Sequence, residues 1–232
     1  MFPDGMKSIY ARGKKMSNRV TYILAGGRLS LPFLKEQLDR HSDRTIIAAD
    51  RGLEACVSLG IEPDFVIGDF DSLDETIREE FLSQEKNVTK LNPIKDDTDT
   101  EAALTLAFEK TEGDIIILGG TGTRLDHVLG NIGILGQGFA HGRSVELLDE
   151  HNRIRLVDGP VTIKKGEQYG KYVSLLPLTT EVKGLTLEGF YYPLHKFTLT
   201  SYTSIGISNE IVEEEARISF DEGVLVMIES KD

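Results

Sequence analysis

The first part of the chain alternates short apolar runs with segments whose apolar residues recur every three or four positions. Short apolar runs are typical of buried strands, and a period near 3.6 residues is typical of helices packed on one face. The predicted strands are Val20–Ala25, Thr45–Ala49, Phe65–Ile67, Asn87–Leu91, Asp114–Leu118 and Val145–Leu148. The predicted helices are Leu31–Arg40, Gly52–Leu59, Leu73–Gln84, Thr98–Glu109 and Leu125–Phe139. This alternation predicts an α/β fold, with a doubly wound, mostly parallel sheet and helices on both of its faces.

After Asp149 the pattern changes to short runs of alternating polarity, separated by glycine, proline and polar turns. The predicted strands here are Ile154–Val157, Val161–Lys164, Tyr172–Leu176, Val182–Leu187, Lys196–Thr200, Glu215–Phe220 and Val224–Ile228. No helical period interrupts them, which is typical of an antiparallel β-sandwich. We therefore expect a flexible N-terminal extension over residues 1–18, an α/β domain over 19–149 and a β-sandwich domain over 150–232.

The composition excludes several classes of partner. The chain carries 38 acidic and 26 basic residues, a formal charge of −12, which argues against nucleic acid and anionic membrane surfaces as principal partners because both bind basic surfaces. No apolar run approaches the roughly 18 residues of a membrane span, and no secretory signal pattern is present, which predicts a cytoplasmic protein. The single cysteine, Cys56, lies among apolar residues of a predicted helix and is interpreted as a buried structural thiol.

Carboxylates follow four successive strands of the predicted parallel sheet. They are Asp50, Asp69, Asp71, Asp96, Asp97, Asp99 and Asp126. Ligands of open parallel sheets bind beyond the carboxyl ends of the strands, so these side chains are expected to gather at one edge. Like charges held close together destabilise one another unless a cation lies between them.

The spacing of these acids favours Mg²⁺. Asp69 and Asp71 project to the same side of an extended segment, and Asp96 and Asp99 share a face at a helix start. Oxygen-only ligation suits Mg²⁺, whereas the histidines and the lone cysteine lack the spacing of a zinc site. Taken singly, each acid has an ordinary alternative, because Asp71 or Ser72, and Asp96 or Asp97, are equally suited to capping the helix that follows.

Glycines end the first and fifth strands. Gly26 and Gly27 precede Arg28, and the segment from Gly119 to Arg124 contains Gly120, Thr121 and Gly122. Main-chain N–H groups beside a helix start can hold phosphates, although the glycines are as well explained by tight turns. Arg28 and Arg124 are candidate phosphate cations. His127 and Asn131 share the face of Arg124 on the predicted helix, and His127 taken alone is better interpreted as structural.

Four motifs together resemble the thiamine pyrophosphokinase family. In chain order they are GDFDS at 68–72, DDTDTEAA at 96–103, GGTGTRLDHVLGN at 119–131 and GISNE at 206–210. The resemblance runs from about Val20 to the C-terminus. It implies an N-terminal α/β domain, a C-terminal β-sandwich and a homodimer with a shared active site. It also implies transfer of a diphosphate group from ATP to the hydroxyl of thiamine, with Mg²⁺, giving thiamine diphosphate and AMP.

The resemblance also assigns roles to individual residues. It implies Asp69, Asp71, Asp96 and Asp99 as metal ligands, with Asp69, Asp71 and Asp99 catalytic and either Asp71 or Asp99 accepting the hydroxyl proton. The expected ATP-binding residues are Gly26, Gly27, Arg28, Asp50, Gly120, Thr121, Gly122, Arg124, Asp126 and His127. The expected thiamine-binding residues are Asp97, Asn131, Ser208 and Asn209. Animal members stack a tryptophan on thiamine, but this chain has none, so an aliphatic contact is expected near Leu225.

Two other functions remain open from the residues alone. The same acids would serve a metal-dependent nucleotide phosphohydrolase that uses water as its nucleophile. A non-catalytic sensor of nucleotide or thiamine is the third reading, although a sensor has little need for so many crowded carboxylates.

Overall fold

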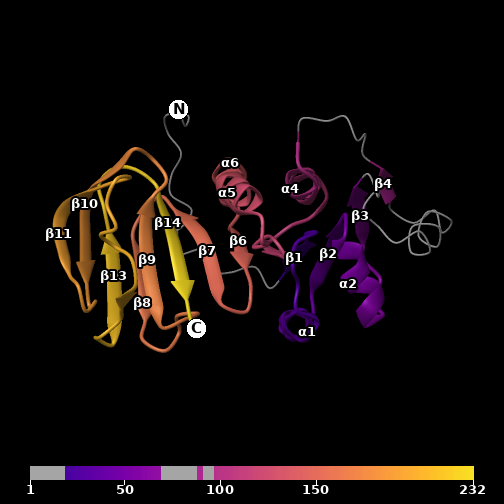
Figure 1. Cartoon of the computed structure of the whole chain (residues 1–232), viewed down its shortest axis with the longest axis horizontal. Helices are drawn as coiled ribbons and strands as arrows, with labels where there is room; N and C mark the ends of the chain where they lie inside the picture. The colour runs from indigo at the N-terminus through magenta and orange to yellow at the C-terminus, as the bar shows by residue number, and fades with distance from the viewer. Residues whose placement is uncertain (1–18, 69–87, 91–96) are drawn as a thin grey trace. The chain divides into compact units, whose positions relative to one another are not determined.

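The computed structural model describes residues 19–68 and 97–232, together with the main chain of 88–90 (Figure 1). These residues form two compact units. The first comprises the described residues up to 134 and residues 147–150, and the second comprises 135–146 and 151–232. Within the described part of the chain, no helix has the length and apolarity that crossing a membrane requires.

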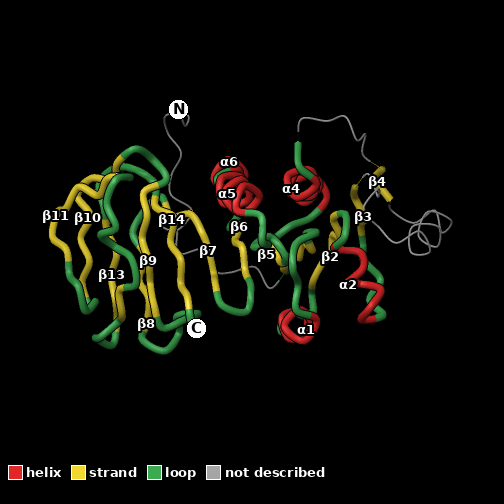
Figure 2. Tube along the Cα trace, in the orientation of Figure 1, coloured by secondary structure: helices red, strands yellow, loops and turns green. Residues whose placement is uncertain are grey.

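The first unit is built on a parallel sheet. Its strands, β1 (Val20–Leu24), β2 (Arg44–Ala49), β3 (Phe65–Gly68), β4 (Val88–Lys90) and β5 (Asp114–Leu118), follow the order β5-β1-β2-β3-β4. All five residues of the interior strand β1 are buried, because helices cover both faces. On one side lie α1 (Leu31–Asp39) and α2 (Gly52–Leu59), and on the other α4 (Asp99–Lys110) and α5 (Leu125–Ile134) (Figure 2). The predicted doubly wound α/β fold is confirmed.

Local sequence accounts for most of the boundaries in this unit. Helix α2 begins and ends where the pattern predicted, and Cys56 lies fully buried on it, as expected. The single predicted helix Leu125–Phe139 is wrong, because α5 ends at Ile134 and a separate α6 (Gln137–His141) follows. Gly130, Gly133 and Gly136 weaken helix propensity there, and Gly136 lies before α6. The predicted helix Leu73–Gln84 lies outside the described residues.

The second unit contains two antiparallel sheets. One has the order β12-β9-β14-β7, from β12 (Asn209–Glu210), β9 (Tyr172–Pro177), β14 (Leu225–Ser230) and β7 (Asn152–Val157). The other has the order β11-β10-β13-β8, from β11 (Leu194–Thr200), β10 (Glu181–Glu188), β13 (Glu215–Ser219) and β8 (Val161–Lys164). Helix α6 and residues 145–146 of β6 (Val145–Leu148) belong to this unit. Residues 147–148 of β6 belong to the first unit. The predicted antiparallel sandwich is confirmed.

The sandwich core explains one wrong expectation. Buried residues alternate with exposed ones along β8 and β10, and their apolar side chains pack into one cluster with Val173, Leu175 and Met227. Leu225 belongs to the same cluster and its exposed fraction is 0%. The aliphatic contact with substrate expected near Leu225 is therefore wrong, since a side chain enclosed by core residues cannot reach a ligand. The short strand β12 was not predicted, because two residues carry no periodic signal.

Candidate active site

A cavity of about 650 Å³ opens in the first unit at the carboxyl ends of β1, β2 and β5. The strand-end loops and the first turns of α4 and α5 supply its wall. Of the site residues predicted from the sequence, those lining it are Gly26, Gly27, Arg28, Asp50, Asp97, Asp99, Gly120, Gly122, Arg124, His127 and Asn131. The structure thus brings together residues that lie as much as 105 positions apart in the chain.

The glycines of the first and fifth strand ends lie against each other. The N–H of Gly27 donates a hydrogen bond to the carbonyl oxygen of Gly119 at 3.0 Å, and a Cβ on Gly27 would collide with that oxygen. Gly119 has a φ of 74°, in the left-handed region that favours glycine. These two glycines therefore permit close approach of two loops. Because the N–H of Gly27 already donates to Gly119, it is not available to a phosphate, and any phosphate in this cavity has to bind to other N–H groups or to side chains.

Asp50 is held in an uncommon conformation at the end of β2. Its φ is 47°, although it is not glycine, and its N–H donates to the carbonyl of Ile67 at 2.9 Å. A Cβ built on Gly26 would lie 3.3 Å from Oδ2 of Asp50, so this carboxylate lies beside the first glycine loop. Left-handed non-glycine residues cost free energy and are concentrated at functional sites.

The start of α4 supplies two carboxylates. Thr98 is the N-cap residue, and its hydroxyl accepts a hydrogen bond from the N–H of Glu101 at 3.2 Å. Capping by Asp97 is therefore wrong, because Thr98 performs that role. Asp97 and Asp99 line the cavity instead, with Asp99 in the first turn, where the helix dipole favours negative charge.

Three arginines, Arg28, Arg51 and Arg124, also line the cavity. Arg124 lies 2.5 Å from the carboxylate of Asp126, and the hydrogen bond from Arg124 holds the pKa of that carboxyl below its ordinary value. Asp126 itself is exposed and is outside the set of residues that line the cavity. Arg51 lines the cavity but was missed, and its only sequence signal is that it follows Asp50 directly at the end of a strand.

Two predicted site residues hold the second glycine loop in place. The amide of Asn131, 7% exposed, donates to the carbonyl oxygen of Gly120 at 2.8 Å. The hydroxyl of Thr121 donates to a carboxylate oxygen of Asp149 at 2.5 Å. Thr121 is outside the cavity lining, and its contact with Asp149 holds the loop in addition to the bond from Asn131.

The donor atoms of the cavity suit a hard cation. Asp50, Asp97 and Asp99 contribute carboxylate oxygens, which Mg²⁺ prefers, and His127 is the sole nitrogen donor among the predicted ligand types in this lining. Asp69, Asp71 and Asp96 lie outside the described residues. Within the described ranges, no group of three histidine, cysteine or acidic residues has the arrangement of a metal site.

Ser208 and Asn209 lie in the second unit. Ser208 has a φ of 55°, and its N–H donates to the hydroxyl of Ser174 at 2.9 Å. Asn209 is 4% exposed, and its side chain forms hydrogen bonds to the main chain of Tyr192. Ser208 therefore ends a constrained turn, and Asn209 begins β12.

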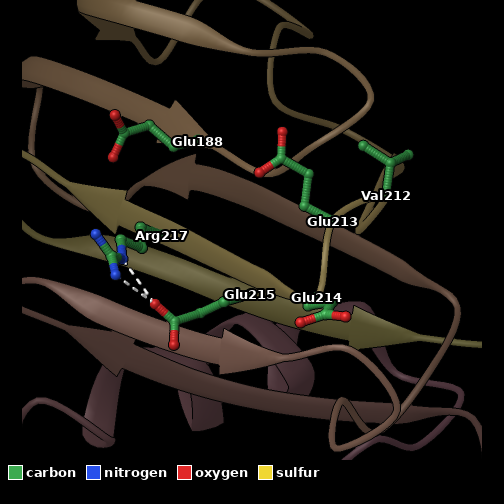
Figure 3. Close-up of a pocket in the computed structure, with 6 residues that line it drawn as sticks. All are labelled: Glu188, Val212, Glu213, Glu214, Glu215 and Arg217. Atoms are coloured by element: carbon green, nitrogen blue, oxygen red, sulfur yellow. Dashed lines mark hydrogen bonds and ion pairs between the residues drawn. The ribbon is translucent and has the colours of Figure 1, made fainter.

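A second cavity, of about 730 Å³, lies in the second unit (Figure 3). It is lined by Glu188, Val212, Glu213, Glu214, Glu215 and Arg217. The guanidinium of Arg217 lies 2.7 Å from the carboxylate of Glu215, so three further glutamates give this surface a negative charge. None of the residues predicted from the sequence as site residues lines this cavity.

Comparison with known proteins connects both units to one family. The family model "Thiamin pyrophosphokinase, catalytic domain" matches residues 37–147, and "Thiamin pyrophosphokinase, vitamin B1 binding domain" matches residues 160–225. The chain is 36% identical over 212 residues to the thiamine pyrophosphokinase of Bacillus subtilis, covering 90% of this chain and 98% of that protein.

Solved structures agree with these matches. The chain resembles the crystal structure of the Bacillus subtilis thiamine pyrophosphokinase with a TM-score of 0.82 and 35% identity, over 92% of this chain and 99% of that one. It resembles the enzyme of the same description from Geobacillus thermodenitrificans with a TM-score of 0.79 and 32% identity, over 92% and 98%. The likeness extends over both units.

Proposed function

This chain belongs to the thiamin pyrophosphokinase family, and on that premise we propose that it transfers a diphosphate group from ATP to the hydroxyl of thiamine, giving thiamine diphosphate and AMP. The observation that carries the proposal is the cavity of the first unit, whose lining brings Asp50, Asp97 and Asp99 together with Arg28, Arg51 and Arg124. Phosphoryl-group transfer needs positioned phosphates and neutralised charge more than covalent participation by the protein. A wall of mixed carboxylates and guanidinium groups supports that chemistry.

In this proposal the arginines and the glycine loops bind ATP. Arg28, Arg51 and Arg124 offer forked donors suited to phosphate oxygens, and the N–H groups around Gly120 and Gly122 lie at the start of α5. We assign Asp50, whose carboxylate lies beside Gly26, to accept hydrogen bonds from the nucleoside. Asp126 acts through its ion pair, because it sets the orientation of Arg124.

The carboxylates at the start of α4 take the metal-binding role. We assign Asp99, with Asp69, Asp71 and Asp96 from outside the described residues, to hold Mg²⁺. When bound, this ion polarises the phosphate oxygens and stabilises the AMP leaving group. Asp71 or Asp99 accepts the proton of the thiamine hydroxyl as that oxygen attacks the β-phosphorus of ATP.

The remaining assignments concern thiamine and the assembly. Asp97 and Asn131, from the first unit, and Ser208 and Asn209, from the second, are proposed to belong to the thiamine site. We also propose a cytoplasmic homodimer with a shared active site, in which residues 19–149 form the catalytic domain. Residues 150–232 then contribute to thiamine binding and to dimer contacts, and the N-terminal extension at 1–18 lies outside the described residues.

A product assay tests the function directly. The protein is incubated with ATP, Mg²⁺ and thiamine, and nucleotides and thiamine esters are separated by chromatography. We expect AMP and thiamine diphosphate in equal amounts, and no product when EDTA removes the cation. Release of ADP contradicts the diphosphate transfer, and thiamine-independent release of AMP or phosphate selects a phosphohydrolase. Binding of both substrates without turnover selects a sensor.

A further inference from the structure

The side chain of Thr121 is bonded to a residue outside the cavity. Residues 119–124, in the loop after β5, all line the cavity of the first unit except Thr121. The hydroxyl of Thr121 donates a hydrogen bond to Oδ2 of Asp149 at 2.5 Å, and Asp149 does not line the cavity either. The side chain of Thr121 therefore connects the loop to the rest of the first unit, while the residues beside it form the cavity wall.

The loop supplies main-chain N–H groups around Thr121. The carbonyl oxygens of Gly119 and Gly120 already accept hydrogen bonds, from the first glycine loop and from α5. In a trans peptide the following N–H points away from the carbonyl oxygen, so the N–H groups of Gly120 and Thr121 point away from these partners. In the part of the chain that the structure describes, no group accepts a hydrogen bond from either N–H or from that of Gly122. The loop therefore offers three consecutive N–H groups to an anion in the cavity.

Asp149 lies directly after β6, within residues 147–150 of the first unit. The loop passes close to this strand end, because a Cβ built on Gly120 would lie 2.5 Å from Cδ2 of Leu147, whose exposed fraction is 0%. Glycine at position 120 thus permits the approach that brings Thr121 to Asp149. A hydroxyl that donates to a carboxylate forms a charge-assisted hydrogen bond, roughly twice as strong as a bond between neutral groups. The bond is therefore a strong restraint on the loop at residue 121.

We propose that Asp149 is a positioning residue of the ATP site, which accepts the hydroxyl of Thr121 and so holds the N–H groups of the loop where the phosphates bind. The proposal rests on the proposed function. It also gives Thr121 a role different from the direct binding that the family resemblance implies, because Thr121 acts on ATP through the shape of the loop and not with its hydroxyl.

The bond contributes to binding because it orders the loop before ATP arrives. When the hydroxyl of Thr121 or the carboxylate of Asp149 is removed, Asn131 still holds Gly120, but residue 121 loses its side-chain restraint. Ordering the loop then becomes part of the cost of binding ATP, which weakens the affinity for ATP. The binding of thiamine, which is assigned to other residues, should change little.

Three single variants test the pair. Thr121→Val removes the hydroxyl at nearly constant volume, Thr121→Ser keeps a hydroxyl, and Asp149→Ala removes the acceptor. In the steady-state assay, Thr121→Val and Asp149→Ala are expected to raise KM for ATP about tenfold, while kcat and KM for thiamine stay within about threefold. Thr121→Ser should retain the KM of the wild type. An unchanged KM for ATP in Asp149→Ala overturns the proposal, and a raised value in Thr121→Val alone shows direct contact between that hydroxyl and ATP.

The double variant shows whether the two side chains act through one bond. Because the bond can be lost only once, Thr121→Val combined with Asp149→Ala should raise KM for ATP no further than either change alone. Effects that multiply to about a hundredfold show that the two residues act independently, which overturns the proposal. If Asp149→Ala does not fold, Asp149→Asn decides, since it keeps a weaker, neutral acceptor. We then expect KM for ATP to rise about threefold, and an unchanged value overturns the proposal.

Thr111→Val separates positioning from general stability. The hydroxyl of Thr111 donates to the carbonyl oxygen of Ala107 and accepts a hydrogen bond from the hydroxyl of Thr21, both at 2.7 Å. Thr111 precedes β5, whereas Thr121 follows it, so the same substitution is made at the opposite end of one strand. We expect Thr111→Val to lower the thermal unfolding midpoint without changing KM for ATP. An equal rise of KM for ATP in Thr111→Val and Thr121→Val assigns the effect to stability and overturns the proposal.

Binding is measured separately from turnover. Titration calorimetry with ATP and Mg²⁺, in the absence of thiamine, gives the dissociation constant of ATP for each variant. We expect it to be about tenfold weaker in Thr121→Val and Asp149→Ala and unchanged in Thr121→Ser and Thr111→Val. Equal affinity in all variants overturns the positioning role even if the wild type lacks turnover. A wild type that binds ATP without forming thiamine diphosphate overturns the proposed function alone, and one that binds no ATP overturns both.

Discussion

The side-chain amide of Asn131 on α5 donates a hydrogen bond to the carbonyl oxygen of Gly120, 2.8 Å away in the loop after β5. The contact is buried and ties a helix to the glycine loop that lines the cavity. An asparagine near the middle of a helix is a poor helix former, so its cost is offset only by a tertiary contact. This bond therefore positions the loop that we assign to ATP.

Removing that donor is expected to weaken ATP binding. Asn131→Ala leaves the Gly120 carbonyl without this amide, and an unsatisfied buried acceptor costs about 1 to 3 kcal/mol. We expect kcat/KM for ATP to fall about tenfold or more, with a lower unfolding midpoint. Steady-state kinetics and thermal unfolding measure both effects. Normal kinetics with ATP would show that the loop keeps its shape without the bond.

Replacing Gly27 is expected to damage the fold of the cavity. In Gly27→Ala the new Cβ meets the carbonyl of Gly119, and such overpacking costs about 1 to 3 kcal/mol. Gly130→Ala is the matched control, because nothing lies within 4 Å of its Cβ and alanine favours the helix by about 1 kcal/mol. Urea unfolding should therefore show opposite shifts. Equal effects of the two variants would contradict the close approach of the loops.

The metal assignment predicts a specific loss in Asp99→Asn. Removing one carboxylate from the proposed ligand set should lower kcat/KM by about 10²-fold, and added Mg²⁺ should recover part of it. Asp39→Asn is the control, since Asp39 pairs with Lys35 on the exposed face of α1. Circular dichroism confirms that both variants fold. If Asp99→Asn keeps its rate at low Mg²⁺, Asp99 is not a ligand.

Burial makes Cys56 unreactive in the native state. Desolvation raises the pKa of this thiol from 9.0 to about 12, which suppresses the thiolate. At pH 8 a disulfide reagent should react with it far more slowly in the native protein than in urea. The thiol ionises at a lower pH in the unfolded chain than in the folded protein. The free energy of unfolding should therefore fall progressively as the pH rises from about 9 to about 12. Cys56→Ala should remove that part of the pH dependence, and an identical slope in both proteins would contradict the shift.

A buried ion pair links β7 to β14 in the second unit. Glu229 is 1% exposed, lies 3.2 Å from Arg155 and accepts a hydrogen bond from the N–H of Tyr169. Glu229→Gln leaves buried guanidinium charge without its carboxylate, so we expect a loss of about 3 kcal/mol in unfolding free energy. Glu222→Gln, which breaks an exposed pair with Lys183, should leave the urea midpoint nearly unchanged. Similar midpoints for both variants would show that the buried pair is replaceable.

The glycine loops show where sequence reasoning stops. From the sequence alone, the segment from Gly119 to Arg124 is explained equally well by a phosphate-binding loop and by a tight turn. The structure shows that Gly27 and Gly119 contact each other, a relationship between loops about 90 positions apart that no local pattern records. Likewise, the sequence offered Asp96 or Asp97 as the cap of this helix, and only the hydrogen bond from the N–H of Glu101 to the hydroxyl of Thr98 identifies Thr98 as the cap. Arg51 was missed because a single arginine after a strand has no periodic signal.

What the sequence by itself determined is the order of elements, the change from parallel α/β to antiparallel sandwich, and the set of strand-end carboxylates. These follow from local periodicity and propensity, which act over a few residues. Only the tertiary structure decided which of those side chains meet, that Leu225 is enclosed in the core, and that Asn209 holds Tyr192. Such contacts depend on packing between distant segments, where the free energy of burial and hydrogen bonding is realised only after the chain has folded.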